Sequence, residues 1–425
     1  MGLHGTETEN DEPDAGRSPS SAFRIIVHDF SGHAFPMDLS RALARRGHVV
    51  RHVYCESFTC GKGRFDVTPD DGALSVLPLR TARPFAKYSP LRRIAQENEY
   101  GRQFAAMAAE FRPDVILACN MPLVVQRTVA AWCREHDVPW VFWLQDLYSV
   151  AINATAVGRL GPPGRVVGWG FERIERALLR EASAVVAITE DFGGLLDEWG
   201  VAEARRAVIE NWAPLAELPE RDRNNAWRRE HGLGDRFTYL YSGTLGLKHR
   251  PELLYELAAQ HVDDADVVVI SEGLGEERLR ELLAERPLPN LRLLPYQPFE
   301  RLPDILGAAD VLVGLLEPTA GTFSVPSKVL SYLCAGRPIL AAIPRANLAA
   351  RTVERAGAGL VVAPTDTEAF LLAAKQLRTD DRLRQVAGRC ARAYAEATFD
   401  TDVVTDRFVN VIGRAVGRPV AVARG

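Results

Sequence analysis

Short apolar runs alternate with amphipathic stretches along most of the chain. The first run, residues 23–30, ends at Ser31-Gly32-His33 and is followed by apolar residues at helical spacing, such as Leu39 and Leu43. Strands that alternate with helices in this way predict a parallel sheet covered on both faces. Further strands are expected in the first half of the chain at residues 49–54, 74–79, 115–119, 140–144, 184–188 and 208–210.

The alternation stops once and then restarts. Residues 214–236 are charged and carry no strand pattern, which is typical of an interdomain linker with one short helix. After it, strands are expected at 237–241, 267–270, 291–294, 311–315, 338–342 and 359–362, and helices from 367 to about 416. The sequence therefore predicts an α/β protein of two doubly wound, Rossmann-like domains, whose strand-to-helix loops would meet in one cleft.

The predicted division of the chain follows from these patterns. It comprises a disordered tail at 1–21, an N-terminal domain at 22–212, a linker at 213–236, a second domain at 237–385 and C-terminal helices at 386–425. The tail is polar and has no apolar core of a signal peptide, and no apolar run is long enough to span a bilayer. These features predict a cytoplasmic protein.

Composition excludes several classes of protein. The chain has 47% hydrophobic and 25% charged residues and a net charge of -4, so it is typical of soluble globular proteins and gives no sign of nucleic-acid binding. The six cysteines show no paired metal-ligand spacing, which predicts buried thiols and no metal site.

Two loops of the second half have the residues to bind an anion. The segment Tyr241-Ser-Gly-Thr-Leu-Gly-Leu-Lys248 follows a predicted strand, and Gly243 would let backbone N–H groups approach a phosphate. In Ser324-Val-Pro-Ser-Lys328, Ser327 and Lys328 stand where a helix begins. Lysine is rare in this chain, which has only five, so two lysines at such loops favour a phosphate site. A plain turn and a capped structural helix remain the alternatives. The turn at Gly273 is a weaker third candidate.

Polar residues also follow strands of the first half. Gly32 and His33 lie in the loop after the first strand, where a ligand can approach closely. Gln145 and Asp146 end another strand and would lie at the rim of the cleft. The carboxylate of Asp146 would hold a hydroxyl of a ligand or cap the following turn, and both readings stay open.

The stretch from Arg80 to Arg93 is basic and aromatic. It contains Arg80, Arg83, Phe85, Lys87, Tyr88, Leu91, Arg92 and Arg93. Such a stretch can lie on an anionic membrane surface, with Phe85 and Tyr88 at the level of the headgroups. The alternative is a solvated loop.

Taken together and in order, these motifs resemble those of glycosyltransferases with the GT-B fold, close to family 4, and within it the bacterial colanic-acid and exopolysaccharide fucosyl- and aminosugar transferases. The resemblance runs from about residue 23 to 407. Its strongest carriers are the two lysine loops, extended to Ser331 and Pro338, with Glu210-Asn-Trp212 and the Gln145-Asp146 segment in support.

The resemblance implies a retaining transferase that uses a nucleoside-diphosphate sugar as donor and needs no metal or other cofactor. Around the diphosphate it places Ser242, Gly243, Lys248, Ser327 and Lys328, and Thr244, Gly273 and Ser331 are further predicted donor-binding residues. The residues predicted to be catalytic are Lys248, Lys328, His33 and Asp146. On the acceptor side it places Gly32, His33, Gln145 and Asp146. The implied acceptor is a lipid-linked or other glycan, met at the inner face of the membrane by a peripheral protein.

The sequence departs from the family pattern at one place. Many family 4 enzymes carry two glutamates separated by seven residues, but their positions are Phe323 and Ser331 here. Glu317 is the nearby carboxylate that would compensate. A nucleotide-sugar 2-epimerase with the same architecture and a non-catalytic subunit that binds nucleotide sugars remain alternative functions. The base, sugar, linkage and oligomeric state are not encoded in any recognisable motif.

Overall fold

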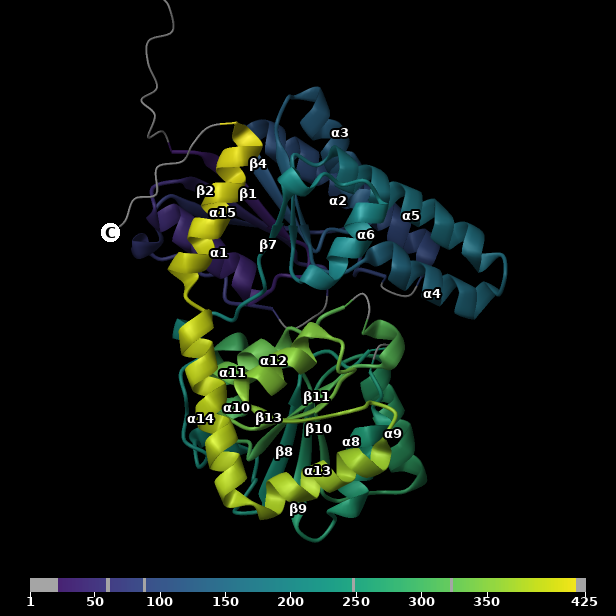
Figure 1. Cartoon of the computed structure of the whole chain (residues 1–425), viewed down its shortest axis with the longest axis vertical. Coiled ribbons are helices and arrows are strands. Elements are labelled where there is room, and N and C mark those ends of the chain that lie inside the picture. The colour runs from purple at the N-terminus through teal and green to yellow at the C-terminus, as the bar shows by residue number, and fades with distance from the viewer. Residues whose placement is uncertain (1–21, 59–61, 87–88, 247–248, 322–323, 418–425) are drawn as a thin grey trace, which may run out of the picture.

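The protein consists of two lobes, which lie one above the other in Figure 1. The computed structural model describes residues 22–58, 62–86, 89–246, 249–321 and 324–417. Each lobe is built on one parallel sheet with helices on both sides. The predicted fold class, two Rossmann-like domains with a helical C-terminal segment, is confirmed. The predicted tail at 1–21 lies outside the described residues.

The upper lobe contains a sheet of seven parallel strands in the order β3-β2-β1-β4-β5-β6-β7. The strands are β1 (Arg24–Asp29), β2 (Val49–Cys55), β3 (Leu74–Leu79), β4 (Val115–Cys119), β5 (Trp140–Leu144), β6 (Ala184–Ala187) and β7 (Arg206–Val208). Every residue of β4, β5 and β6 is buried, because helices cover both faces, and this explains why these strands are continuous apolar runs. The helices are α1 (Ala34–Arg45), α2 (Pro90–Phe111), α3 (Leu123–Glu135), α4 (Tyr148–Leu160), α5 (Gly164–Glu181) and α6 (Gly193–Glu198).

The lower lobe contains six parallel strands in the order β10-β9-β8-β11-β12-β13. They are β8 (Phe237–Ser242), β9 (Ala265–Ile270), β10 (Leu291–Leu294), β11 (Val311–Leu315), β12 (Ile339–Ala342) and β13 (Gly359–Val362). Successive side chains enter opposite cores: Tyr239 and Tyr241 belong to one apolar cluster and Leu240 to the other. The helices are α8 (Glu252–Gln260), α9 (Leu274–Glu285), α10 (Leu302–Gly307), α11 (Lys328–Cys334), α12 (Leu348–Ala356), α13 (Thr367–Thr379) and α14 (Asp381–Thr398).

The predicted linker carries the short helix α7 (Ala226–Glu230), as expected. Strand β7 differs from the prediction. A strand was expected at residues 208–210, but β7 covers residues 206–208, where it pairs with β6. Short 3₁₀ helices complete the structure at Pro69–Asp71, Glu190–Phe192, Glu203–Arg205, Leu215–Glu217, Phe299–Arg301 and Pro318–Ala320.

The C-terminal helices are divided between the lobes (Figure 1). Helix α14 packs against α11, α12 and α13 of the lower lobe, whereas α15 (Thr401–Val416) returns to α1 and the upper sheet. The ring of Phe408 on α15 lies 4.5 Å from the ring of Trp143 on β5. The Thr401 hydroxyl and the Trp212 indole N–H both donate to Asp38 at 2.8 Å. The last helix is therefore part of the upper lobe's core.

None of the helices within the described ranges is long and apolar enough to cross a membrane.

Candidate active site

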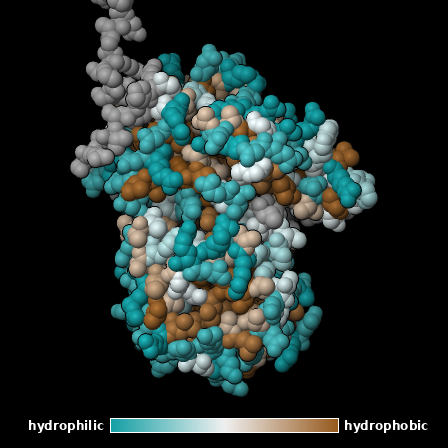
Figure 2. Space-filling model, viewed as in Figure 1, coloured by the Kyte–Doolittle hydropathy of each residue, from teal (hydrophilic) through white to brown (hydrophobic). Residues whose placement is uncertain are grey.

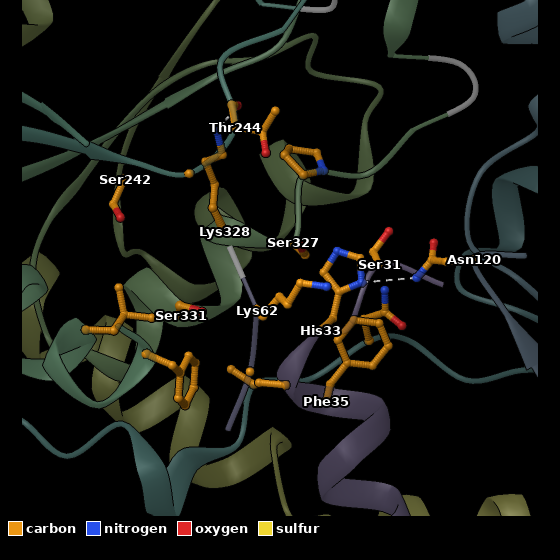
Figure 3. Close-up of a pocket in the computed structure, with 18 of the residues that line it drawn as sticks. Ser31, His33, Phe35, Lys62, Asn120, Ser242, Thr244, Ser327, Lys328 and Ser331 are labelled. Carbon is orange, nitrogen blue, oxygen red and sulfur yellow. Dashed lines mark hydrogen bonds between the residues drawn. The ribbon is translucent and has the colours of Figure 1, made fainter. Parts of the chain in front are cut away.

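A cavity of about 580 Å³ lies between the two lobes, where the carboxyl ends of both sheets face each other. Figure 3 shows Ser242, Thr244, Ser327 and Lys328 on the lower-lobe wall and Ser31, His33 and Asn120 on the upper-lobe wall. The predicted site residues in its lining are His33, Gln145, Asp146, Ser242, Gly243, Thr244, Ser327, Lys328 and Ser331. The structure thus brings together side chains that are far apart in the sequence.

Lys328 is held by a buried tyrosine of the neighbouring strand. Its ammonium nitrogen lies 3.8 Å from the ring centroid of Tyr241, donates to the Tyr241 hydroxyl and donates to the Thr244 carbonyl at 3.2 Å. Burial raises the pKa of Tyr241, so the hydroxyl stays protonated and itself donates to the Thr244 carbonyl at 2.8 Å. The aromatic face and the two oxygens hold the cation of Lys328 at the cavity wall.

A second tyrosine ties the loop after β8 to helix α11. The Tyr332 hydroxyl accepts from the Ser242 N–H at 3.0 Å and donates to the Ser242 carbonyl at 3.1 Å. The next residue, Gly243, has a φ of 130°, and a Cβ there would lie 3.2 Å from Cε of Lys328. The backbone conformation therefore requires glycine, and a Cβ at this position would displace the Lys328 side chain by a few tenths of an ångström.

On the upper wall, a buried carboxylate orients His33. Asp29 ends β1 and is fully buried; it accepts from the His33 backbone N–H, from His33 Nδ1 at 3.1 Å and from Asn120 Nδ2 at 2.8 Å. Burial alone would raise the pKa of Asp29, but the charge and hydrogen bonds of His33, with the Asn120 amide, bring it below its usual range. Because the carboxylate is ionised, it accepts a hydrogen bond from Nδ1. When the ring is neutral, Nδ1 therefore carries the proton and Nε2 is the hydrogen-bond acceptor; when the ring is protonated, its positive charge is what lowers the pKa of Asp29.

Gln145 and Asp146 both reach the cavity, as predicted from their place after β5. The Gln145 amide, however, exchanges two hydrogen bonds with Asn211, at 2.6 and 3.1 Å. This pair fastens the end of β5 to the segment that enters the linker. Gln145 therefore shapes the wall of the cavity, whereas Asp146 contributes a carboxylate to it.

Three predicted site residues lie outside the lining of the cavity. Gly32 has a φ of 77° and packs beneath Phe65, so it forms the turn behind His33. Gly273, with a φ of 112°, is the residue before α9. Glu317 precedes the 3₁₀ helix at 318–320, and its carbonyl accepts from the Ala320 N–H. Lys248 and Phe323 lie outside the described residues, so their predicted roles stay predictions.

Several residues that line the cavity, or that hold its lining in place, were not predicted from the sequence. They are Asp29, Lys62, Arg93, Asn120, Tyr241, Tyr296 and Tyr332. Asp29 carried a signal, since a carboxylate four residues before a candidate histidine, at the end of a strand, can reach its ring. Lys62 and Arg93 carried none, because their approach to the cavity depends on how separate loops pack.

The basic and aromatic stretch differs from its prediction. Arg80 pairs with Glu56, and Arg93 lies in α2, donates to Glu97 at 2.6 Å and lines the cavity. The Phe85 ring packs against Phe30 and Phe58, with centroids at 5.3 and 5.5 Å. The Phe85 ring is half-buried and packs against the apolar core, so it is less available to a bilayer than the sequence suggested, and the membrane contact of this stretch stays a prediction. Lys87 and Tyr88 lie outside the described residues.

The sequence contains two Asp-x-Asp pairs of the kind that can hold a metal ion, Asp264-Ala-Asp266 and Asp400-Thr-Asp402, and none of these four residues lines the cavity. Asp266 is buried near the start of β9 and pairs with Arg236 and Arg292, and Asp400 caps α15. Within the described parts of the chain, no group of three or more His, Cys, Asp or Glu side chains could hold a metal ion.

Comparison with known proteins matches both lobes to families. A model described as a glycosyl transferase 4-like domain matches residues 33–212, and one described as glycosyl transferases group 1 matches residues 223–394. Two facing Rossmann-like domains that share a cleft, matched by these families, define a glycosyltransferase of the GT-B fold. The chain belongs to the GT-B glycosyltransferases of the family 4-like type.

Individual relatives agree with this assignment. The putative colanic acid biosynthesis glycosyl transferase WcaI of Escherichia coli K12 is 25% identical over 387 residues, which cover 87% of this chain and 93% of the relative. Sucrose-phosphate synthase from Thermosynechococcus elongatus superposes with a TM-score of 0.73 at 17% identity, over 93% of this chain and 100% of that one. Anabaena HepE in complex with UDP-glucose superposes with a TM-score of 0.68 at 16% identity, over 92% of this chain and 99% of that one. The two structures share the fold.

Proposed function

We propose that this glycosyltransferase moves a sugar from a nucleoside-diphosphate sugar to a hydroxyl of a glycan acceptor, with retention of anomeric configuration, in exopolysaccharide synthesis. The observation that carries the proposal is the Lys328 ammonium, held at the cavity wall by Tyr241 beside the loop at Ser242 and Gly243. The solved structure of HepE contains UDP-glucose, and the relative WcaI is described as a colanic acid enzyme; both support this assignment.

The donor half is proposed to neutralise the leaving group. The bond from the anomeric carbon to the diphosphate oxygen breaks, and negative charge grows on the diphosphate. Lys328 supplies a fixed positive charge, and the hydroxyls of Thr244, Ser327 and Ser331 supply hydrogen bonds to the phosphates or the sugar. Groups that are already in place before the reaction stabilise such charge most effectively.

The acceptor half is proposed to position the incoming hydroxyl. His33, with its proton held on Nδ1 by Asp29, accepts a hydrogen bond from that hydroxyl through Nε2. The acceptor oxygen bonds to the anomeric carbon on the face that the diphosphate leaves, and its proton passes to a leaving diphosphate oxygen. Asp146 is the carboxylate among the described lining residues, and it lies on the acceptor side. Retention by this same-face route needs no carboxylate nucleophile on the donor side.

A panel of UDP-, GDP- and dTDP-sugars tests the proposal, with an extract of bacterial lipid-linked glycans as acceptor. Release of nucleoside diphosphate that depends on both substrates is the expected result, and NMR of the product should show the donor's anomeric configuration. Conversion of the sugar without acceptor would identify an epimerase. Binding without turnover would identify a non-catalytic subunit, and an inverted product would overturn the same-face route.

A further inference from the structure

Helices α4 and α5 form a hairpin that projects sideways from the upper lobe (Figure 1). The two helices pack very closely along each other: a Cβ on Gly164 would lie 2.2 Å from the Ala156 carbonyl oxygen, and one on Gly168 would lie 2.1 Å from the Asn153 side chain. Such contact fixes the hairpin as one element, so its outer face presents a defined set of side chains.

That outer face carries large apolar side chains in contact with water. Val166 is 70% exposed, Trp169 57% and Leu160 58%, with Val167 beside them. Figure 2 shows brown side chains at the end of the projecting hairpin. The other six tryptophans of the chain are at most 9% exposed, so burial of tryptophan is the rule and Trp169 the exception. Exposed apolar residues gathered on one element mark an interaction site.

The charge near these residues is mostly positive, with the exposed Glu172 as an acidic exception on α5. No acidic residue occurs between Asp146 and Glu172, whereas Arg165 lies exposed among the apolar residues and the Arg173 guanidinium lies 4.8 Å from the Trp169 ring centroid. Apolar and aromatic side chains flanked by arginine fit the interface of an anionic bilayer. A second copy of the chain fits less well, because a symmetric contact would bring two arginine-bearing tips together.

The hairpin is connected to the active site. Tyr148, the first residue of α4, lines the cavity together with Arg93 of α2. Leu91, two residues before Arg93 on α2, is 84% exposed, and Ile94, the residue after Arg93, is 38% exposed. The hairpin therefore begins at the acceptor wall of the cavity.

We propose that the surface formed by Leu160, Arg165, Val166, Val167 and Trp169 docks the upper lobe on an anionic bilayer. This proposal rests on the proposed function in one respect only, namely that the acceptor is lipid-linked. Docking itself requires no turnover. It adds a contact on the hairpin to the one predicted for the stretch at 80–93, whose Phe85 ring packs against Phe30.

Intrinsic fluorescence of the full chain tests the docking. Vesicles of phosphatidylglycerol and phosphatidylethanolamine should shift the emission to the blue, and brominated lipid should quench the Trp169 component, because the other tryptophans are buried. Pure phosphatidylcholine vesicles should give little binding, and salt should weaken binding to the anionic ones. No binding to anionic vesicles at low salt would overturn the proposal.

Variants distinguish binding through this surface from nonspecific binding to lipid. By vesicle sedimentation, V166S/W169S should lower the partition coefficient at least tenfold, and Arg165→Gln about fivefold, as expected for one cation near an anionic leaflet. The matched control is Leu372→Ser on α13 of the lower lobe, since Leu372 is 58% exposed and should not matter.

The proposal would be overturned if neither hairpin variant changed binding to anionic vesicles, or if the control variant lowered binding as much as the hairpin variants do. A concentration-dependent dimer, seen by sedimentation velocity, that V166S/W169S abolishes would also overturn it. Donor binding, measured with UDP-, GDP- and dTDP-sugars, should be unchanged in the hairpin variants, so failure of docking is distinguishable from failure of the proposed transfer.

Discussion

Replacing Lys328 with alanine removes the positive charge proposed to stabilise the leaving diphosphate. A cation about 4 Å from a phosphate oxygen, at an effective dielectric constant of about 20, contributes roughly 4 kcal/mol. Loss of one preorganised group of this kind typically lowers kcat by about 10² to 10³. We therefore expect kcat for Lys328→Ala to fall by about that factor, with a smaller change in KM.

The assay is steady-state release of nucleoside diphosphate from the accepted donor, with circular dichroism to verify folding. Lys375→Ala is the matched control, since Lys375 is an exposed lysine on α13 of the same lobe. Lys328→Arg should recover only part of the rate, because Gly243 and the Tyr241 ring leave little room for a guanidinium. A folded Lys328→Ala protein with kcat within about threefold of wild type would refute the reasoning, since the expected loss is far larger.

Four further predictions follow from individual contacts. Gly243→Ala should weaken donor binding and lower Tm. A φ of 130° costs a residue other than glycine about 1–3 kcal/mol, and the new Cβ would press on Lys328. An unchanged donor affinity, measured by calorimetry, would contradict this. Asp29→Asn should lower kcat roughly 10- to 100-fold by loosening control of the His33 tautomer, while donor affinity stays the same; a normal kcat would remove the positioning role. Burial lowers the pKa of His28 to about 3 and that of His52 to about 4, so between these values and pH 6.5 the unfolded chain binds protons that the folded chain does not. In that window the free energy of unfolding should fall by about 1.4 kcal/mol per pH unit for each histidine as the pH is lowered. Urea titrations should show a smaller slope for His52→Gln, and a flat profile would disprove the reasoning. Activity should persist in excess chelator, because the acidic pairs at Asp266 and Asp400 lie away from the cavity; inhibition reversed by magnesium or manganese would contradict this.

The fold was predictable because its strands are buried on both faces. The runs at β4, β5 and β11 are apolar at nearly every position, and amphipathic helices separate them, so period and order together identify a doubly wound sheet. The division of the C-terminal helices was not predictable. Helices α14 and α15 have similar amphipathic patterns, and nothing local distinguishes the helix that packs on the lower lobe from the one that returns to Trp143.

The site was predictable where it depends on a loop and not where it depends on packing between loops. Gly243 and His33 lie just after strands, and Lys328 begins the helix that comes after β11, so their place at the cleft follows from topology. The hydrogen-bonded pair of Gln145 and Asn211 joins residues 66 positions apart. Such contacts arise from three-dimensional packing, which the order of residues along the chain does not reveal.

The return of α15 to the upper lobe has a consequence for synthesis on the ribosome. The core around Trp143 and Trp212 is completed by Phe408, which leaves the ribosome only after the whole lower lobe has been made. Domains usually fold in the order of their synthesis, the N-terminal one first. Here the lobe that begins first is completed only when α15 emerges, so until then Trp143 and Trp212 lack the Phe408 ring that packs on both. A fragment that ends at residue 398 keeps α14 but lacks the helix that carries this ring.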